Sequence, residues 1–342
     1  MLTEDFHYNY PEHLVAAQPQ KDFRILWSGG AEKAPREITK AELFSEFTPG
    51  DVLTINDTRV LRRRVTAPNG LEILFIKKVG TTSDEIWEVL CPARVLKDGE
   101  EFALPGDITA KLVARGLPQK LRISKLLDEN YFSAHGELAI PPYIQKARGE
   151  RFNRPEEEKW YQTEWAKNAG SQAAPTASLH FSKQDLAFLI GNGIRVTSLT
   201  LHVGMGTFLP IKTPHIEQHQ MHSESVNIPA SSVRAIIEAK VKGQKVWALG
   251  TTVARALESW GHGLLHENEK GDFIGESALF IYPGFRFEVV GGLLTNFHQP
   301  SSTLLALISA FANREQVLSA YEWAIAQKFR LFSYGDLTAW KR

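Results

Sequence analysis

Histidines gather in one stretch of this chain, among threonines, glycines and prolines. Five of the eleven histidines fall between Leu179 and Glu224. Imidazole is the side chain that titrates nearest neutral pH, so a dense group of histidines indicates proton transfer or metal binding. Segments with this composition are also poorly suited to form a packed hydrophobic core. The stretch is therefore predicted to carry chemistry, and its histidines are His180, His202, His215, His219 and His222.

The spacing of the last three histidines suggests one specific hypothesis, a zinc site. On a helix, His215, His219 and His222 would lie on one face, as the ligands of a zinc hydrolase do. Pro214 and Pro229 flank this segment, however, and argue against a long regular helix. Two other interpretations stay open: solvated or hydrogen-bonding histidines, and an organic active site that includes His219, His222 or Glu224.

Polar turns next to predicted strands and helices are the other candidate sites. Gly250-Thr251-Thr252 lies between a predicted strand and a predicted helix, where free backbone N–H groups and hydroxyls can bind a polar or anionic group. Helix capping explains the same residues equally well. The segments Thr295–Thr303 and Phe332–Asp336 are similar polar turns. The sequence contains neither G-x-G-x-x-G nor the P-loop pattern.

A further polar turn, Asn56-Asp57-Thr58-Arg59, follows a predicted strand and could present its side chains from a rigid support. An Asx-turn with a surface arginine is the alternative. Arg59 also begins the chain's only dense basic run, which continues with Arg62, Arg63 and Arg64. These arginines are the best candidates for phosphate contacts, although a solvated edge would have the same composition.

The elements that must position these residues divide the chain into two parts. Short β-prone runs alternate with turn signals between about residues 64 and 139, which is typical of a small antiparallel barrel or sandwich. Helices and strands alternate after Pro141-Pro142, which favours a sheet covered by helices. The predicted fold is therefore a mixed α/β main domain, residues 1–64 and 140–342, with an inserted small antiparallel β-barrel domain, residues 65–139.

Composition limits the class of protein. Thirty-nine basic residues balance thirty-nine acidic ones, so contact with nucleic acid must come from a local patch. The single cysteine, Cys91, excludes an internal disulfide and is expected to be a buried structural thiol. No signal peptide and no membrane-spanning segment are expected, and we predict a cytoplasmic protein.

The strings quoted above, taken in order with several others, resemble one known family, the S-adenosylmethionine:tRNA ribosyltransferase-isomerases of queuosine biosynthesis. The similarity covers almost the whole chain. Each string alone is weak evidence, and their order makes the set specific. The strings are Gly50-Asp51, Asn56 to Val60, Gly136 to Leu138, Pro141 to Ile144, Tyr161 to Thr163, Gly170-Ser171, Ala173 to Ala177, Leu179 to Phe181, Leu201 to Gly204, Gly206 to Phe208, Met221 to Glu224, Gly250 to Thr252, Thr295 to His298 and Phe332 to Asp336.

The resemblance implies both a reaction and a fold. Members transfer the ribosyl group of S-adenosylmethionine to 7-aminomethyl-7-deazaguanine at the tRNA wobble position and isomerise it, which gives epoxyqueuosine-tRNA and releases adenine and methionine. The family architecture is an α/β main domain with an inserted β-barrel. The sulfonium substrate is already activated, so no metal is expected, and the implied partner is the tRNA anticodon arm, with no obligate protein partner.

This chemistry assigns roles to the polar turns. A base must remove a proton beside the sulfonium, and an acid must assist the departure of adenine. The candidate catalytic residues are His180, His202, His222, Glu224, His298 and Asp336. The candidate substrate-binding residues are Asp57, Thr176, Thr207, Thr251, Thr252 and Asn296. The candidate tRNA-binding residues are Arg59, Arg62, Arg63 and Arg64.

The chain departs from the usual family pattern at a few positions. Ser301 stands where a lysine is usual, Ser178 replaces a glycine, Met205 replaces a small residue and Trp160 replaces an arginine. The basic segment around residues 21–26 is also shortened. A diverged paralogue with another acceptor and a non-catalytic tRNA-binding module therefore remain alternatives to the transferase.

Overall fold

The computed structural model describes residues 1–20, 22–29, 34–80, 85–92, 94, 96–150, 153–204 and 211–342. The chain forms two compact units. The first contains Met1–Arg59, Pro141–Phe152 and Lys159–Arg342, and the second contains Val60–Ile140 and Asn153–Glu158. No helix in the described parts of the chain is both long and apolar enough to span a membrane.

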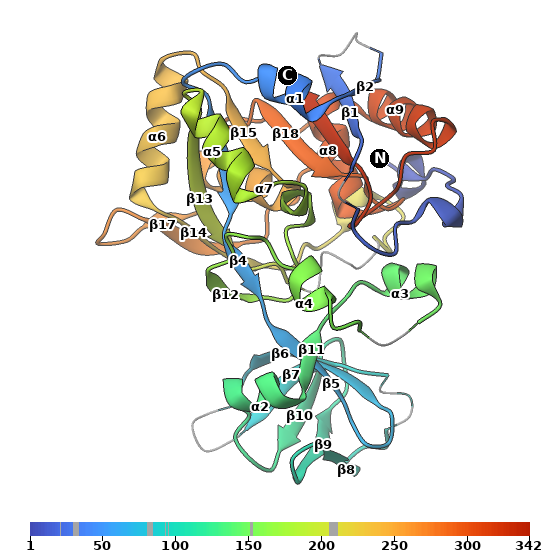
Figure 1. The fold of residues 1–342 in the computed structure, drawn as a ribbon. Helices are drawn as coiled ribbons and strands as arrows, with labels where there is room; N and C mark the ends of the chain where they lie inside the picture. The colour runs from blue at the N-terminus through green and yellow to red at the C-terminus, as the bar shows by residue number, and fades with distance from the viewer. Residues whose placement is uncertain are drawn as a thin grey trace. The chain divides into compact units, whose positions relative to one another are not determined.

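A mixed sheet forms the centre of the first unit (Figure 1). Among the described residues it has ten strands, in the order β16-β17-β14-β13-β3-β15-β18-β19-β1-β2. Four neighbours, β13, β3, β15 and β18, run parallel to one another. The strands are β1 (Ile25–Gly29), β2 (Arg36–Ile38), β3 (Val52–Asn56), β13 (Arg195–Leu201), β14 (Glu224–Ile228), β15 (Val246–Leu249), β16 (His266–Glu267), β17 (Phe273–Ser277), β18 (Gly292–Asn296) and β19 (Leu337–Lys341). A separate pair joins β4 (Thr58–Val60) and β12 (Asn168–Ser171).

The central strands are buried on both faces, because alternate side chains enter two different hydrophobic clusters. In β15, Val246 and Ala248 belong to one cluster, and Trp247 and Leu249 belong to the other. Helices supply the remaining apolar side chains on each face. The first cluster takes them from α6 (Ala230–Val241), α7 (Thr251–Gly261), α8 (Thr303–Ala312) and α9 (Arg314–Ala326). The second takes them from α1 (Lys40–Ser45) and α5 (Lys183–Gly191).

Local sequence signals set the ends of several helices. Ser182 caps α5 by accepting a hydrogen bond from the Asp185 amide, and the Asp185 carboxylate accepts one from the Ser182 amide. Ser302 caps α8 in the same way through the Leu305 amide. Short 3₁₀ helices occur at Thr3–Phe6, Glu12–Leu14, Thr176–His180 and Ile216–Gln218.

The second unit contains an antiparallel sheet and one helix. Among the described residues, seven strands pair in the order β11-β5-β6-β7-β10-β9-β8, and the end strands β11 and β8 do not pair with each other. The described strands therefore form an open sheet, and the expected small β-barrel is not confirmed. Helix α2 (Glu129–His135) packs against the sheet, with Phe132 edge-on to Phe75 and Trp87. The strands are β5 (Arg62–Thr66), β6 (Glu72–Lys78), β7 (Ile86–Leu90), β8 (Glu101–Leu104), β9 (Ile108–Ala114), β10 (Gln119–Ile123) and β11 (Gly136–Leu138).

The charged segment 146–159 is mostly exposed where the structure describes it. It contains the end of helix α3 (Pro142–Arg148) and the start of α4 (Glu157–Trp160), and the Glu157 side chain is buried. Strand β13 pairs with β3 as far as Leu199 and with β14 from Thr200, without a register shift.

Candidate active site

The polar turns identified in the sequence follow neighbouring strands of the main sheet. Parallel strands end at the same edge, and β13, β3, β15 and β18 are parallel neighbours. Asn56, His202, Gly250 and Asn296 stand at these four carboxyl ends. Antiparallel β19 begins at the same edge, because Leu337 pairs with Asn296. The fold thus gathers turns that are far apart in the sequence, from Asn56 to Asp336.

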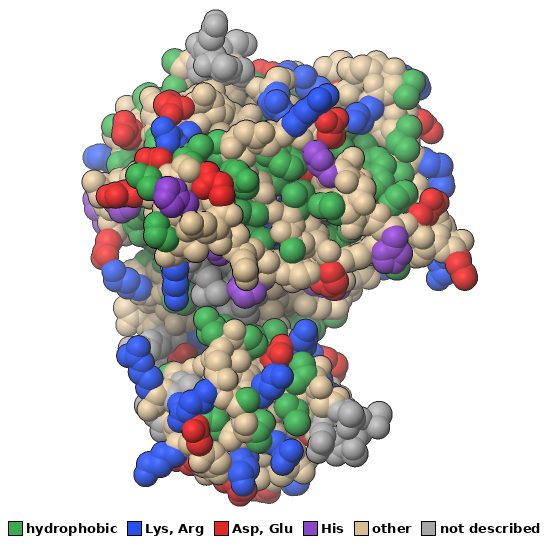
Figure 2. All heavy atoms as spheres, turned by 180° about the vertical axis from the view of Figure 1, so that it is seen from behind, with side chains coloured by type: hydrophobic (Ala, Val, Ile, Leu, Met, Phe, Trp, Pro, Cys, Tyr) green, Lys and Arg blue, Asp and Glu red, His purple; other side chains and the backbone are tan. Residues whose placement is uncertain are grey.

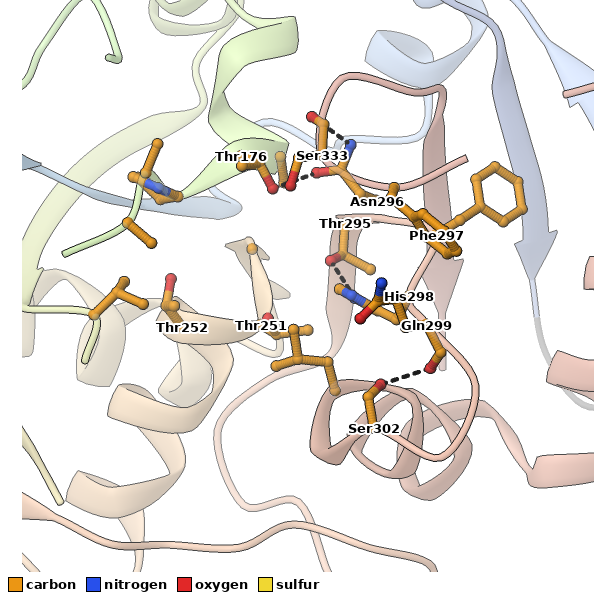
Figure 3. Close-up of a pocket in the computed structure, with 18 of the residues that line it drawn as sticks. Thr176, Thr251, Thr252, Thr295, Asn296, Phe297, His298, Gln299, Ser302 and Ser333 are labelled. Atoms are coloured by element: carbon orange, nitrogen blue, oxygen red, sulfur yellow. Dashed lines mark hydrogen bonds between the residues drawn. The ribbon is translucent and has the colours of Figure 1, made fainter. Parts of the chain in front are cut away.

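A pocket of about 690 Å³, open solvent at its mouth included, lies at this edge (Figure 3). Five of the candidate residues line it, and several aromatic and small side chains complete the wall. The candidates are Thr176, Thr251, Thr252, Asn296 and His298. The other lining residues are Tyr143, Tyr161, Ala173, Ala174, Pro175, Ala177, Val203, Gly250, Thr295, Phe297, Gln299, Ser302, Leu304, Phe332 and Ser333.

The first turn of α7 forms one side of the pocket. Gly250 precedes it with φ of +103°, a conformation that glycine adopts without strain, and no side chain caps the helix. The first backbone N–H groups of a helix have no partner within the helix. The hydroxyl of Thr252 is buried and has no hydrogen-bond partner among the described residues. This turn therefore offers unused donors to a bound ligand.

Asn296 connects the pocket to His180. Its amide nitrogen lies 3.0 Å from Nε2 of His180 and 3.5 Å from the Ser333 carbonyl oxygen. Its amide oxygen accepts a hydrogen bond from the Thr176 hydroxyl at 2.9 Å (Figure 3). Burial lowers the pKa of His180 to about 3, with smaller contributions from Arg330 and Lys40. His180 itself does not line the pocket and reaches it through Asn296.

His298 faces the pocket directly. Its Nε2 lies 3.0 Å from the Thr295 hydroxyl, and its backbone is held by the hydroxyls of Tyr8 and Tyr321. The side chain is 8% exposed, and burial lowers its pKa to about 3. His298 is therefore neutral near pH 7, which is the form that can accept a proton.

His202 belongs to a neighbouring polar cluster. Its Nδ1 lies 2.8 Å from the Thr58 hydroxyl, and its ring packs so tightly on Gly170 that a Cβ there would come within 2.6 Å. Burial lowers the pKa of His202, and the Asp57 carboxylate opposes that shift. Asp57 accepts hydrogen bonds from Thr200 at 2.6 Å and from the Asn168 side chain at 3.1 Å. Neither His202 nor Asp57 lines the pocket, although Val203 does.

Glu224 and His222 lie two positions apart in the sequence but differ in environment. Glu224 is buried, accepts a hydrogen bond from the Gly204 amide at 2.7 Å and forms an ion pair with the buried Arg255. His222 is exposed. Its neighbour Met221 lines a second, smaller cavity that also includes Arg255.

Asp336 is fully buried in an ion pair instead of lining the pocket. Its carboxylate accepts hydrogen bonds from the Arg24 and Arg330 amides, at 3.0 and 2.7 Å, and from the Arg330 guanidinium at 2.6 Å. These contacts tie the loop before β19 to the start of β1. The position fits a structural role.

The four arginines of the basic run lie in different environments. Arg59 is exposed. Arg62 pairs with Glu158 and is partly exposed, whereas Arg63 and Arg64 are buried and pair with Glu129 and Glu137. Lys and Arg side chains, mixed with acidic ones, are spread over the visible face of the second unit (Figure 2).

The zinc hypothesis is not favoured. Only Ile216–Gln218 of its segment is helical, as a single 3₁₀ turn, so the helical face that would align the histidines does not form. No group of three or more potential ligands gathers within the described ranges. Thr207 and Met205 lie outside the described residues.

Sequence reasoning missed several residues at this edge. Ser333 and Gln299 lie in polar turns that the sequence marks, and Tyr161 lies in one of the strings shared with the family, but none of the three was named as a site residue. Arg255 had a usable signal, because helical spacing places it one turn after Thr251 and Thr252. Its burial and its ion pair depend on tertiary structure.

The fold is that of a mixed α/β protein, and a pocket at the carboxyl ends of parallel strands, beside a helix N-terminus, is typical of small-molecule sites in such proteins. A family model described as "Queuosine biosynthesis protein" matches residues 3–339. The chain belongs to this family, and the resemblance expected from the sequence is confirmed.

Individual relatives match this chain over almost its full length. Proteins from Halothermothrix orenii and Citrifermentans bemidjiense are each 38% identical, over 98% of this chain and 98% of their own, and are named S-adenosylmethionine:tRNA ribosyltransferase-isomerase. The crystal structure of the S-adenosylmethionine tRNA ribosyltransferase from Thermotoga maritima superposes with a TM-score of 0.56 at 27% identity. The match covers 98% of this chain and 99% of that one.

Proposed function

We propose that this protein is an S-adenosylmethionine:tRNA ribosyltransferase-isomerase. It transfers the ribosyl group of S-adenosylmethionine to 7-aminomethyl-7-deazaguanine at the tRNA wobble position and isomerises it, giving epoxyqueuosine-tRNA, adenine and methionine. The observation that carries the proposal is the convergence of Thr176, Thr251, Thr252, Asn296 and His298 on one pocket. Full-length similarity to proteins named for this activity supports it.

His298 is proposed as the proton-transferring residue nearest the reacting sugar. The reaction needs a base beside the sulfonium, and His298 is the imidazole that lines the pocket. His202 is the second acid–base candidate, since Asp57 would stabilise its protonated form. Asn296 is proposed to position the sugar, with His180 and Thr176 holding its amide in place.

The remaining polar groups are proposed to bind substrates. Thr251 and Thr252 contact S-adenosylmethionine, and Arg59 contacts phosphates of the anticodon arm. The sulfonium is already a good leaving group, so the proposed mechanism uses no metal. We place the enzyme in the cytoplasm, acting on tRNA without an obligate protein partner. Residues 65–139 are proposed to form the family's inserted barrel-like domain.

The test is release of adenine. Purified protein is incubated with S-adenosylmethionine and tRNA that carries 7-aminomethyl-7-deazaguanine, with guanine-bearing tRNA as the control acceptor. Adenine released only with the modified tRNA supports the proposal. No release with either tRNA contradicts it, and equal release with both would indicate a different acceptor. Retention of activity in a chelator would argue against the zinc hydrolase.

A further inference from the structure

A second cavity adjoins the pocket and shares three of its lining residues. Thr251, Thr252 and Leu304 line both spaces. The second cavity has a volume of about 300 Å³, open solvent included. Its wall is mainly apolar, and two polar side chains, Arg255 and Thr303, complete it. The apolar lining residues are Met221, Leu279, Phe280, Ile281, Leu304 and Leu307.

Unused hydrogen-bonding groups line this cavity. Thr252 and Thr303 are 9% and 4% exposed, and neither hydroxyl has a hydrogen-bond partner among the described residues. Neither hydroxyl is needed to cap its helix, because α7 begins at Gly250 without a side-chain cap and α8 is capped by Ser302. Both residues line the second cavity, so their hydroxyls are available to hydrogen-bond a ligand bound there.

Arg255 adds a positive charge. The side chain is 5% exposed and pairs with Glu224, but its Nε has no hydrogen-bond partner among the described residues. A guanidinium has five N–H donors in a planar fork, and one carboxylate cannot use all of them. The cavity therefore combines an apolar wall with donors from Arg255, two hydroxyls and the N-terminal turn of α7, which together suit a carboxylate on a short aliphatic chain.

We propose that this second cavity binds the methionyl arm of S-adenosylmethionine, with its carboxylate held by Arg255, Thr252 and Thr303. This inference rests on the proposed function and assigns a subsite within it. The adenosyl part then occupies the larger pocket, and the sulfonium lies near Thr251 and Thr252, where the two spaces meet. Glu224 is a positioning residue that orients Arg255.

Decarboxylated S-adenosylmethionine, which has a hydrogen in place of the carboxylate, tests the subsite. Adenine release with modified tRNA is measured for both donors, and the ratio of their kcat/KM values reports recognition of the carboxylate. We expect the wild type to favour the intact donor at least about 30-fold. Thr252→Val and Thr303→Val keep the side-chain shape, and each should reduce that ratio at least fivefold by impairing the intact donor.

Ser309→Ala is the matched control. Ser309 lies on α8 with a buried hydroxyl that also lacks a partner among the described residues, yet it lines neither cavity. Its loss should leave the ratio unchanged. Thermal unfolding of all three variants checks that each remains folded at the assay temperature.

Equal kcat/KM values for the two donors in the wild type would overturn the subsite while the proposed function stands. An enzyme that turns over neither donor would defeat the proposed function itself. If the valine variants raise KM for tRNA and keep the donor ratio, the bound anion is an RNA phosphate, and the proposal is wrong.

Discussion

The side-chain amide of Asn296 donates a hydrogen bond to Nε2 of His180 at 3.0 Å. An amide nitrogen can only donate, so Nε2 must accept and the ring proton must be on Nδ1. The Ser333 carbonyl oxygen, 3.5 Å from the same nitrogen, supports this orientation of the amide. Burial lowers the pKa of His180 to about 3, which agrees with a neutral ring. His180 therefore holds Asn296 in place and does not itself contact the pocket.

Replacing Asn296 with Asp tests this relationship. A carboxylate cannot donate to His180 or to Ser333, so we expect kcat to fall about 100-fold, as for loss of one oriented donor in an active site. Thr176→Val removes only the hydroxyl that donates to the amide oxygen and should have a smaller effect. Nitrogen NMR of the wild type should show His180 protonated on Nδ1 at pH 7. A proton on Nε2 would contradict the assignment.

His298 should make the protein less stable in acid. Its folded-state pKa of about 3 lies below the value of roughly 6.5 expected in the unfolded chain. As pH falls through this window, the unfolded chain takes up a proton that the folded chain does not, so the free energy of unfolding decreases. One such histidine contributes a slope of about 1.4 kcal/mol per pH unit.

Urea unfolding between pH 4.5 and 5.5 measures that slope. We expect His298→Asn to reduce it by about 1.4 kcal/mol per pH unit, whatever the variant's absolute stability. His13→Asn, at an exposed site, is the control and should keep the wild-type slope. An unchanged slope in His298→Asn would mean that His298 titrates normally in the folded protein.

Asp336 should act through stability. Asp336→Asn leaves the Arg330 guanidinium without its buried partner, and we expect a loss of about 3 kcal/mol in the free energy of unfolding. Glu238→Gln, which breaks the exposed pair with Arg195, should cost less than about 1 kcal/mol. At a temperature where Asp336→Asn is folded, kcat should stay close to that of the wild type. A large fall in kcat at full stability would instead place Asp336 in the chemistry.

The basic run should separate into binding and structural arginines. Arg59→Ala should weaken tRNA binding and reduce the salt dependence of the binding constant by about one unit, as expected for one lost phosphate contact. Arg63→Ala removes an ion pair to Glu129 and a guanidinium stacked 4.1 Å from the centre of the Phe132 ring, so it should lower Tm. The salt dependence of tRNA binding by Arg63→Ala should match that of the wild type. The opposite pattern would show that Arg63 is the phosphate contact.

Local signals predicted much of this molecule. The Ser182–Asp185 capping box and the turn at Gly250 are encoded within a few residues, so helices α5 and α7 begin where the sequence indicates. Closure of the second sheet depends on pairing between strands far apart in sequence, and the expected barrel is not confirmed.

For the candidate site too, some residues could be predicted from local signals and others depended on tertiary structure. Polar turns after parallel strands identified Thr251, Thr252, Asn296 and His298, since strand direction brings such turns to one edge. Burial was not readable from the sequence. It depends on which side chains pack around a residue, so exposed His222 and ion-paired Asp336 were indistinguishable from pocket residues.

Isotope tracing tests the central claim most directly. S-adenosylmethionine is labelled with ¹³C either in the ribose or in the S-methyl group, and the modified tRNA is digested to nucleosides after reaction. Mass spectrometry should find the ribose label in the tRNA nucleoside, with one adenine released per label transferred, and should find the methyl label only in free methionine. The methyl label in the tRNA, or the ribose label absent from it, would contradict ribosyl transfer.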